Sequence, residues 1–197
     1  MLCERVIAIV EEAATVRAAM MTKQEIRQQM RSILSLPPDV RGEKSARICE
    51  QIRSLPAWGK ARAVVLFAPQ TREPDVELLW PHAAGRRMIY PRMDMELLAL
   101  YAVESPFDLQ PAKWGIREPR ALPEALVSPS EVHLVLVPGV AFTKAGLRCG
   151  RGGGFYDRLL ASLPPTVCKV GVCFDGQLLD EVPMEPHDLP VDVVVWG

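Results

Sequence analysis

The segment from Gly146 to Arg158 carries the residue types best suited to binding an anion. It holds five of the thirteen glycines in the chain, and three arginines lie among them. Glycine allows positive φ angles and a close approach of ligand to backbone, and arginine presents a planar charged fork that matches phosphate or carboxylate oxygens. A strand-like run at 133–142 precedes the segment, and a helix beginning near Gly154 would direct its free N–H groups toward it. The sequence therefore predicts an anion-binding loop between a strand and a helix, with phosphate as the expected ligand.

The glycine spacing differs from that of the commoner phosphate motifs. No Lys-Ser or Lys-Thr pair follows the second glycine, as the Walker motif would require. The pattern Gly150-x-Gly152-x-Gly154 also departs from the dinucleotide-binding fingerprint. The alternative is a flexible basic turn, but a turn does not need five glycines and three arginines.

The composition argues against several kinds of partner. A net charge of −1 and only 6% aromatic residues do not favour nucleic acid, and no apolar run reaches the length of a membrane-spanning helix. The five cysteines are irregularly spaced without a Cys-x-x-Cys motif, which favours a reducing, cytoplasmic location over a zinc site or disulfide framework. Cys149 lies inside the glycine segment with no base near it in sequence, so we expect it to pack rather than act as a nucleophile.

The elements that must position this loop alternate along the chain. Thr22 and Glu25 have the spacing of a capping box and predict a helix over 22–36, before Pro37. Further helices are expected at 39–55, 75–84 and 155–163, and strands at 63–67, 87–90 (ended by Pro91), 97–103, 132–137, 167–174 and 191–196. The proline-rich stretch 105–131 is expected to run over the surface.

This alternation predicts a single-domain α/β protein with a mostly parallel sheet of about six strands flanked by helices. Ligands of such sheets bind at the carboxyl ends of the strands, here the loops 68–74, 138–154 and 174–190. Residues 1–20 are expected to be an N-terminal extension of a domain spanning 21–197, because Met20 and Met21 before the capping box offer an alternative start.

Several motifs in order resemble one family. The run from Val137 to Phe142, followed by the glycine segment with Phe-Tyr-Asp157, resembles the signature of 5-formyltetrahydrofolate cyclo-ligases, also called 5,10-methenyltetrahydrofolate synthetases. Four further matches are Lys23-x-x-x-Arg27, Glu73, Trp114-Gly-Ile-x-Glu-Pro119 and the segment 182–192. The resemblance covers the chain from about residue 22 to its end, with Cys149 in place of a usual leucine.

The resemblance implies an activity and a fold. The implied reaction is the cyclisation of 5-formyltetrahydrofolate, with or without a polyglutamate tail, to 5,10-methenyltetrahydrofolate. It requires ATP and Mg²⁺, passes through a phosphorylated formyl intermediate and releases ADP and phosphate. The implied fold is that of the sugar-phosphate isomerase and CoA-transferase-like α/β proteins, and we expect a monomer.

The resemblance also assigns site residues. The ATP site is implied to contain Lys23, Gln24, Glu25, Ile26, Arg27, Arg148, Cys149, Gly150, Arg151, Gly152, Gly153, Gly154, Phe155 and Tyr156. The folate site is implied to contain Ala68, Glu73, Trp114, Gly152, Gly153, Gly154 and Phe155, and the metal site Asp157 and Asp188. Arg151 and Tyr156 are the expected catalytic residues.

Taken alone, some of these residues have ordinary structural explanations. Lys23, Arg27 and Arg31 recur every four residues, as on a solvated helix face. Asp157 suits the first turn of a helix, and Asp188 suits a turn.

Two further residues and two rival functions stay open. Glu73 suits a helix start, and a lone tryptophan such as Trp114 is often part of a core. The rival functions are a non-catalytic module that binds nucleotide or folate, and a sugar-phosphate isomerase-like enzyme with Glu73 as its base.

Overall fold

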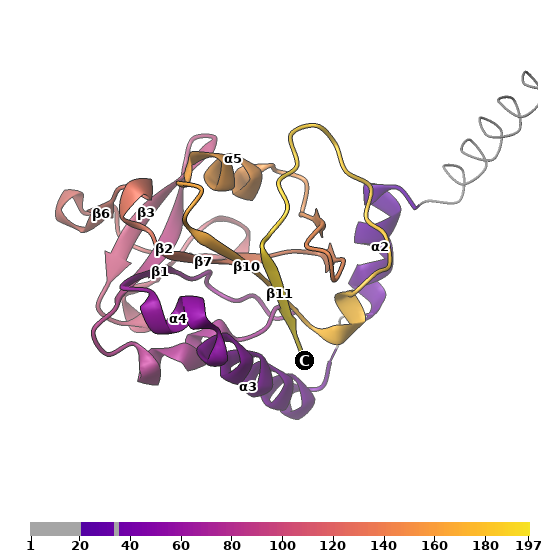
Figure 1. Ribbon diagram of the computed structural model, residues 1–197, viewed down its shortest axis with the longest axis horizontal. Coiled ribbons are helices and arrows are strands. Elements are labelled where there is room, and N and C mark those ends of the chain that lie inside the picture. Colours follow the sequence, from indigo (N-terminus) through magenta and orange to yellow (C-terminus); the bar gives the residue numbers. More distant parts are fainter. Residues whose placement is uncertain (1–20, 34–35) are drawn as a thin grey trace, which may run out of the picture.

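A central sheet of seven strands organises the chain (Figure 1). The computed structural model describes residues 21–33 and 36–197, so the predicted extension 1–20 lies outside the described residues. The strands are β1 (Ala63–Val65), β2 (Arg87–Asp94), β3 (Leu97–Val103), β6 (Leu126–Val127), β7 (Leu134–Pro138), β10 (Cys168–Cys173) and β11 (Val193–Trp196). Their order is β11-β10-β7-β1-β2-β3-β6, parallel from β11 to β2 and antiparallel at β3 and β6. The predicted mostly parallel α/β sheet is confirmed, with one strand more than expected.

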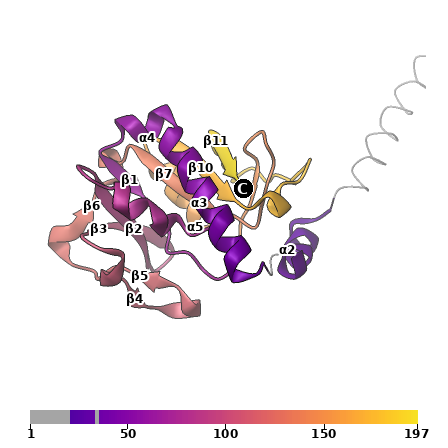
Figure 2. The same cartoon turned by 90° about the horizontal axis from the view of Figure 1, so that it is seen from below.

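Helices cover both faces of this sheet. They are α3 (Pro38–Ser54), α4 (Pro56–Lys60) and α5 (Phe155–Ser162), whereas α2 (Lys23–Ile33) packs against the hairpin that follows β7. Figures 1 and 2 show α3 and α4 on the opposite side of the sheet from α5. Successive residues of β1 explain this layering, because Val64 packs in one core cluster with Ile48 of α3, whereas Val65 packs in the other with Leu159 of α5.

Proline explains two departures from the predicted elements. The predicted helix 75–84 is a 3-10 helix, η1 (Val76–His82), with Pro81 inside it. The predicted end of the second strand at Pro91 was wrong, because β2 continues to Asp94. Pro91 lies beyond the pairing of β2 with β1 and opposite Leu100 of β3, so the strand has a neighbour on only one side there and the missing N–H is tolerated.

The stretch 105–131 is more ordered than predicted. It forms a small antiparallel pair, β4 (Gln110–Pro111) and β5 (Arg117–Glu118), and then the edge strand β6. Short 3-10 turns, η2 (Pro106–Asp108), η3 (Lys113–Gly115), η4 (Pro123–Ala125) and η5 (Pro129–Glu131), fill the rest. The β4–β5 pair also contacts β2.

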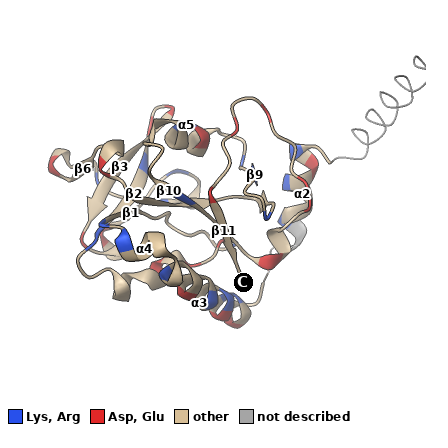
Figure 3. Cartoon of the chain, in the orientation of Figure 1, with Lys and Arg blue, Asp and Glu red and all other residues tan. Residues whose placement is uncertain are grey.

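The loops that follow the parallel strands lead into the remaining elements. After β7 the chain forms the hairpin β8 (Ala141–Phe142) and β9 (Arg148–Cys149) and enters the glycine loop before α5. After β10 it forms η6 (Asp175–Gln177) and a long segment that packs beside α2 (Figure 1). Figure 3 shows charges of both signs on α2 and α3. None of the helices described is long and apolar enough to cross a bilayer.

Candidate active site

A cavity of 810 Å³ lies where these loops meet. Its walls come from the start of α2, the end of β1, the β4–β5 pair, the glycine loop and the segment after β10. The following predicted site residues line it: Lys23, Gln24, Arg27, Ala68, Glu73, Trp114, Arg148, Gly150, Arg151, Gly152, Gly153, Gly154, Phe155, Tyr156, Asp157 and Asp188. The fold therefore brings together residues from positions as distant as 23 and 188.

Three predicted residues do not line the cavity. The Glu25 carboxylate accepts a hydrogen bond from the Thr22 backbone N–H at 2.7 Å, which confirms the capping box. Ile26 is 1% exposed and belongs to the core. Cys149 is fully buried, and burial raises the pKa of its thiol, which supports the predicted packing role.

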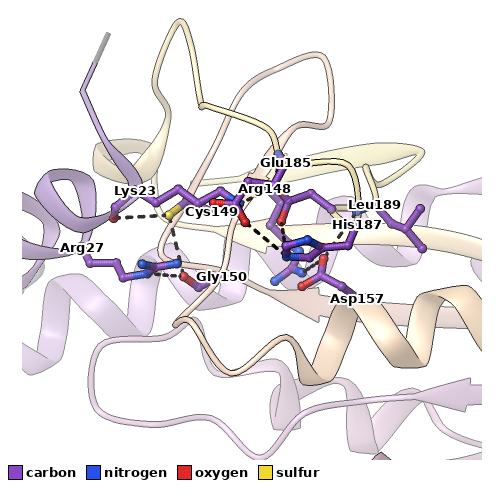
Figure 4. Close-up of polar contacts among 10 residues, drawn as sticks. Lys23, Arg27, Arg148, Cys149, Gly150, Asp157, Glu185, His187 and Leu189 are labelled. Atoms are coloured by element: carbon purple, nitrogen blue, oxygen red, sulfur yellow. Dashed lines mark hydrogen bonds and ion pairs between the residues drawn. The ribbon is translucent and has the colours of Figure 1, made fainter.

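The glycine loop has the geometry that its sequence predicts. Gly152 and Gly154 have φ angles of 106° and 65°, and Gly154 caps the start of α5. The first turn of α5 therefore presents its free N–H groups toward the loop. Arg27 reaches over from α2, and its Nε donates to the Gly150 carbonyl at 2.8 Å (Figure 4).

Two ion pairs place carboxylates beside this loop. The Arg148 Nη2 lies 2.6 Å from Asp157 Oδ1, and Arg148 is only 4% exposed. Its Nε is buried without a hydrogen-bond partner among the described residues. Lys23 pairs with Asp188, joining α2 to the segment after β10. Burial disfavours the charged form of Asp188, but hydrogen bonds from Lys23 and the Glu185 N–H outweigh it and lower its pKa.

The two carboxylates are suited to a hard cation. Asp157 Oδ1 accepts from Arg148 and from the Leu189 N–H, and Oδ2 makes no hydrogen bond within the described residues. Asp188 uses Oδ2 for its hydrogen bonds, whereas Oδ1 lies 4.0 Å from His187 Nε2. Each side chain thus keeps one oxygen for a ligand, and Mg²⁺ commonly takes one or two carboxylates together with phosphate oxygens.

Arg151 and Glu73 form a third ion pair across the cavity. The Arg151 Nη2 lies 2.6 Å from Glu73 Oε1, and Arg151 also donates to the Gln70 side chain. The other Glu73 oxygen accepts from the Gln70 backbone N–H at 2.9 Å. Glu73 is 8% exposed, so this carboxylate is a positioned group of the wall and not a solvated helix-start residue.

The aromatic residues of the cavity differ in exposure. Burial, and secondarily the nearby Glu73 carboxylate, raises the pKa of Tyr156, so its phenol is a protonated donor. Trp114 is 72% exposed and has a φ of 57° at the tip of the β4–β5 connection. The core alternative for Trp114 is therefore wrong, and its ring is available at the cavity rim.

Several charged residues have roles that spacing did not reveal. Arg158 Nε donates to the Glu96 carbonyl at 2.7 Å and its guanidinium stacks on Phe155, so it fastens the loop rather than lining the cavity. Arg117, Glu185 and His187 line the cavity, although the sequence had not singled them out, and Glu118 of the matched segment 114–119 lines it too. Glu185 and His187 lie just before the predicted metal residue Asp188, and proximity to it is the only signal that could have identified them.

The fold and the cavity define an α/β protein whose ligand site is built on a cationic glycine loop at the carboxyl ends of its strands. The chain belongs to the 5-formyltetrahydrofolate cyclo-ligase family, whose model matches residues 19–197. It is therefore an enzyme, a ligase of folate one-carbon metabolism, and the family indicates 5,10-methenyltetrahydrofolate synthetase activity.

Individual relatives agree with this assignment. The 5-formyltetrahydrofolate cyclo-ligase of Escherichia coli K12 is 31% identical over 180 residues, covering 86% of this chain and 95% of the relative. That of Mycolicibacterium smegmatis is 41% identical over 92 residues, 46% of each chain. The NMR structure of 5,10-methenyltetrahydrofolate synthetase from Aquifex aeolicus superimposes with a TM-score of 0.78 at 34% identity, covering 89% of this chain and 90% of that one.

Proposed function

We propose that the protein cyclises 5-formyltetrahydrofolate to 5,10-methenyltetrahydrofolate with ATP and Mg²⁺, through a phosphorylated formyl intermediate, and releases ADP and phosphate. The observation that carries this proposal is the meeting of the glycine loop, Arg148 and Arg151 with the carboxylates of Asp157 and Asp188 in one cavity. Phosphoryl transfer needs this combination of hydrogen-bond donors to the phosphate oxygens and a metal site. We also propose that the sheet has the sugar-phosphate isomerase and CoA-transferase-like fold, for which its mostly parallel order is support.

The chemistry of the substrate explains why ATP is needed. A formyl group on nitrogen is an amide, whose resonance makes the carbon a weak electrophile. Transfer of the γ-phosphoryl group to the formyl oxygen activates that carbon and converts a poor leaving group into phosphate. The second folate nitrogen then attacks the carbon and the C–O bond to phosphate breaks. Because this attack is intramolecular, holding the nitrogen in place is worth roughly 7–11 kcal/mol.

The phosphates would be held by the cationic half of the cavity. Lys23, Arg27, Arg148 and Arg151 all line it, and Arg148 is held rigidly by burial. Backbone N–H groups of Gly150 to Gly154 and the first turn of α5 would supply further donors. The oxygens that Asp157 and Asp188 keep free would hold Mg²⁺, which offsets phosphate charge when bound.

The folate ring would lie against the opposite wall. Glu73 presents a fixed carboxylate suited to the N–H groups of a pterin, and Ala68 lies beside it at the end of β1. Trp114 offers an exposed ring for stacking, and the protonated Tyr156 phenol can donate to the reacting formyl group.

A turnover assay tests the proposal. Protein, Mg-ATP and 5-formyltetrahydrofolate should produce the near-ultraviolet absorbance of the methenyl product together with ADP, and EDTA should abolish the signal. Arg151→Ala should lower kcat/KM roughly 100-fold, because it removes a charged hydrogen-bond donor to the phosphate oxygens. Arg53→Ala, an exposed arginine of α3 outside the cavity, is the matched control.

Other outcomes identify the rival functions. Binding of folate or nucleotide without ADP release would favour a binding module, and isomerisation of a sugar phosphate without ATP would favour an isomerase. A fully active Arg151→Ala variant would exclude Arg151 from phosphate binding.

The free cysteines described, Cys49, Cys149, Cys168 and Cys173, support the inferred cytoplasmic location, since a reducing compartment keeps thiols reduced. The monomeric state, the absence of nucleic-acid and membrane partners, and the boundary between residues 1–20 and the domain stay predictions.

A further inference from the structure

The β4–β5 arm, residues 110–118, forms one wall of the cavity and carries Trp114 at its tip. It comprises β4, η3 and β5, and Figure 2 shows it beside β2 at the edge of the molecule. Four residues of the arm line the cavity, Trp114, Ile116, Arg117 and Glu118. The position of the arm therefore decides where the exposed ring of Trp114 lies relative to a ligand.

Polar contacts, more than apolar packing, hold this arm. None of residues 110–118, each of which the structure describes, belongs to either hydrophobic core cluster. Trp114 and Gly115 have φ angles of 57° and 71°, and the left-handed conformation is strained for a tryptophan. Such a backbone persists only where the surrounding contacts fix it, so the polar contacts of the arm must supply its position.

Contacts with β2 and with η1 tie the arm to the body of the protein. Glu118 is 5% exposed and accepts a hydrogen bond from the Met93 N–H of β2 at 3.1 Å. Arg117 Nη2 donates to both carboxylate oxygens of Glu77, at 2.9 Å each. Glu77 belongs to η1, whose Leu79 is fully buried, so this ion pair fastens the arm to a fixed part of the core.

Glu77 is itself fixed by two aromatic side chains. The Tyr90 hydroxyl accepts from Trp80 Nε1 at 2.9 Å and donates to Glu77 Oε1 at 3.4 Å. Tyr90 is fully buried in β2, and the Glu77 side chain is only 17% exposed. Burial raises the pKa of Glu77, and the Arg117 guanidinium opposes this rise. The network thus holds the carboxylate in place, and Arg117 stabilises its charged form.

The position of Glu77 limits what it can do. Glu77 is not among the residues that line the cavity, whereas its partner Arg117 is, so Glu77 can affect a ligand only through another residue. At the tip of the arm, Gln70 Nε2 adds a longer hydrogen bond of 3.3 Å to the Trp114 carbonyl. The Arg117–Glu77 ion pair is therefore the charged link between the tip of the arm and the core.

We propose that Glu77 is a positioning residue for the cyclisation, which holds the β4–β5 arm through Arg117 so that the Trp114 ring covers the folate. The inference rests on the proposed function, in which the folate ring stacks on Trp114. Stacking depends on the distance and offset of the two rings, so a displacement of about 1 Å would weaken it. Loss of the ion pair should therefore weaken folate binding more than it destabilises the fold, because partly exposed ion pairs contribute little to stability.

The test measures folate binding, turnover and the mobility of the arm. Glu77→Ala, Glu77→Gln and Arg117→Ala are compared with the wild type by calorimetry with 5-formyltetrahydrofolate and with nucleotide, and by kcat and KM for each substrate. Hydrogen exchange of peptides covering 110–118, without ligand, reports on the arm directly. Glu131→Ala is the matched control, since it removes an ion pair of 2.7 Å with Arg87 and neither residue lines the cavity. Thermal unfolding confirms that the variants fold.

We expect Glu77→Ala and Arg117→Ala each to raise the folate dissociation constant and KM roughly tenfold and to speed hydrogen exchange of the arm. Nucleotide affinity and kcat should stay within about threefold. Glu77→Gln should recover part of the loss, because its amide oxygen can still accept from Arg117. The control Glu131→Ala should match the wild type within about twofold.

Double variants test whether these residues act together. Because Glu77 and Arg117 act as a unit, Glu77→Ala/Arg117→Ala should bind folate no more weakly than either single variant. In a Trp114→Ala background, Glu77→Ala should cause no further loss, since the ring that it positions is already absent.

Three results would overturn the inference. Weaker folate binding by Arg117→Ala but not by Glu77→Ala would make Arg117 a direct ligand of folate. An undiminished effect of Glu77→Ala in the Trp114→Ala background would show that Glu77 does not act through this ring. Unchanged hydrogen exchange of 110–118 would show that Glu77 does not hold the arm. If Glu77→Ala loosens the arm and weakens folate binding but the wild type catalyses no cyclisation, the proposed function alone is contradicted.

Discussion

Burial decides the chemistry of the cysteine in the glycine segment. Cys149 is fully enclosed, and its pKa is raised because its thiolate would lose solvation there, despite the cations Arg27 and Lys23 nearby. The same cause raises the pKa of Cys49 and of Cys173 to about 12 in each case. The thiolate is the reactive form, so none of these residues is poised as a nucleophile.

Native protein should therefore resist thiol alkylation at these three positions at pH 8. Iodoacetamide labelling followed by peptide mass spectrometry should find them modified only after unfolding, with denatured protein as the control. Cys149→Ala should keep near wild-type kcat and lose about 1 kcal/mol of stability through its small cavity. Rapid labelling of Cys149 in the native state, or inactivity of a folded Cys149→Ala variant, would restore the nucleophile hypothesis.

At the scale of elements, the turn at Gly146 has no room for a side chain. Its φ is 92°, and a Cβ there would lie 2.2 Å from the backbone oxygen of Val191. The two segments are joined by a hydrogen bond of 2.9 Å from the Val191 N–H to the Gly146 carbonyl. This glycine therefore allows the β8–β9 hairpin to pack against the segment that precedes β11.

Gly146→Ala should lower the free energy of unfolding by about 2 kcal/mol or more, because the left-handed backbone and the backbone clash both oppose it. Gly42→Ala is the matched control, since Gly42 lies within α3 with nothing within 4 Å of its Cβ position. That control should gain roughly 0.5–1 kcal/mol from helix propensity. Urea denaturation measures the free energy of unfolding of both variants. Equal stabilities would show that the backbone at Val191 can move away from the added methyl group without cost.

Elements with a repeating apolar pattern could be predicted, and those without one could not. The runs at 63–67 and 132–137 identified β1 and β7 because both faces of these strands are buried. The two-residue strands β4, β5 and β6 are too short to carry any apolar pattern. They form because β4 pairs with β5 and β6 pairs with β3. The extension of β2 past Pro91 is possible because β1 stops pairing with β2 before Pro91, whereas β3 continues to pair with it. The extents of these pairings are a property of the assembled sheet.

At the scale of the whole molecule, ion pairs hold the segment after β10 to distant elements. Lys44 of α3 lies 2.8 Å from Asp175, 131 positions along the chain, and the Asp175 N–H donates to the Gly197 carbonyl at 3.0 Å. The hydrogen bond from Lys44 is the main cause that lowers the pKa of Asp175 from its ordinary value of 3.8.

A lowered carboxyl pKa gives a definite sign to the pH dependence. The contribution of Asp175 to stability is present above about pH 3.8 and is lost as the pH falls through the lower folded pKa. Asp175→Asn should therefore cost about 0.5 kcal/mol at pH 7, a small value because the pair is exposed, and the difference should shrink as the pH falls below about 3.8. Asp180→Asn, an exposed aspartate of the same segment, is the control. A difference that grows on acidification would contradict the assignment.

The site could be predicted in its parts but not in its connections. Residue types and spacing predicted the glycine loop, because loop chemistry is local in sequence, whereas only the family resemblance assigned Asp157 and Asp188 to the metal site. The pairing of Asp188 with Lys23, and a second cavity of 570 Å³ lined by Arg31 and Arg72, join segments that only the fold brings together. The exposed position of Trp114 likewise follows from a left-handed turn that its sequence did not signal.

The bond between Arg151 and Glu73 has a consequence for the order of events in solution. If the nucleotide binds Arg151 and the pterin binds Glu73, the ligand that binds first must break the Arg151–Glu73 ion pair. The second ligand then binds a side chain that is already free of this ion pair. Thermodynamic reciprocity requires each ligand to raise the affinity of the other by one common factor. A folate dissociation constant that falls when a non-hydrolysable nucleotide is present would reveal this cooperation, and a constant that stays the same would show that the two ligands act independently.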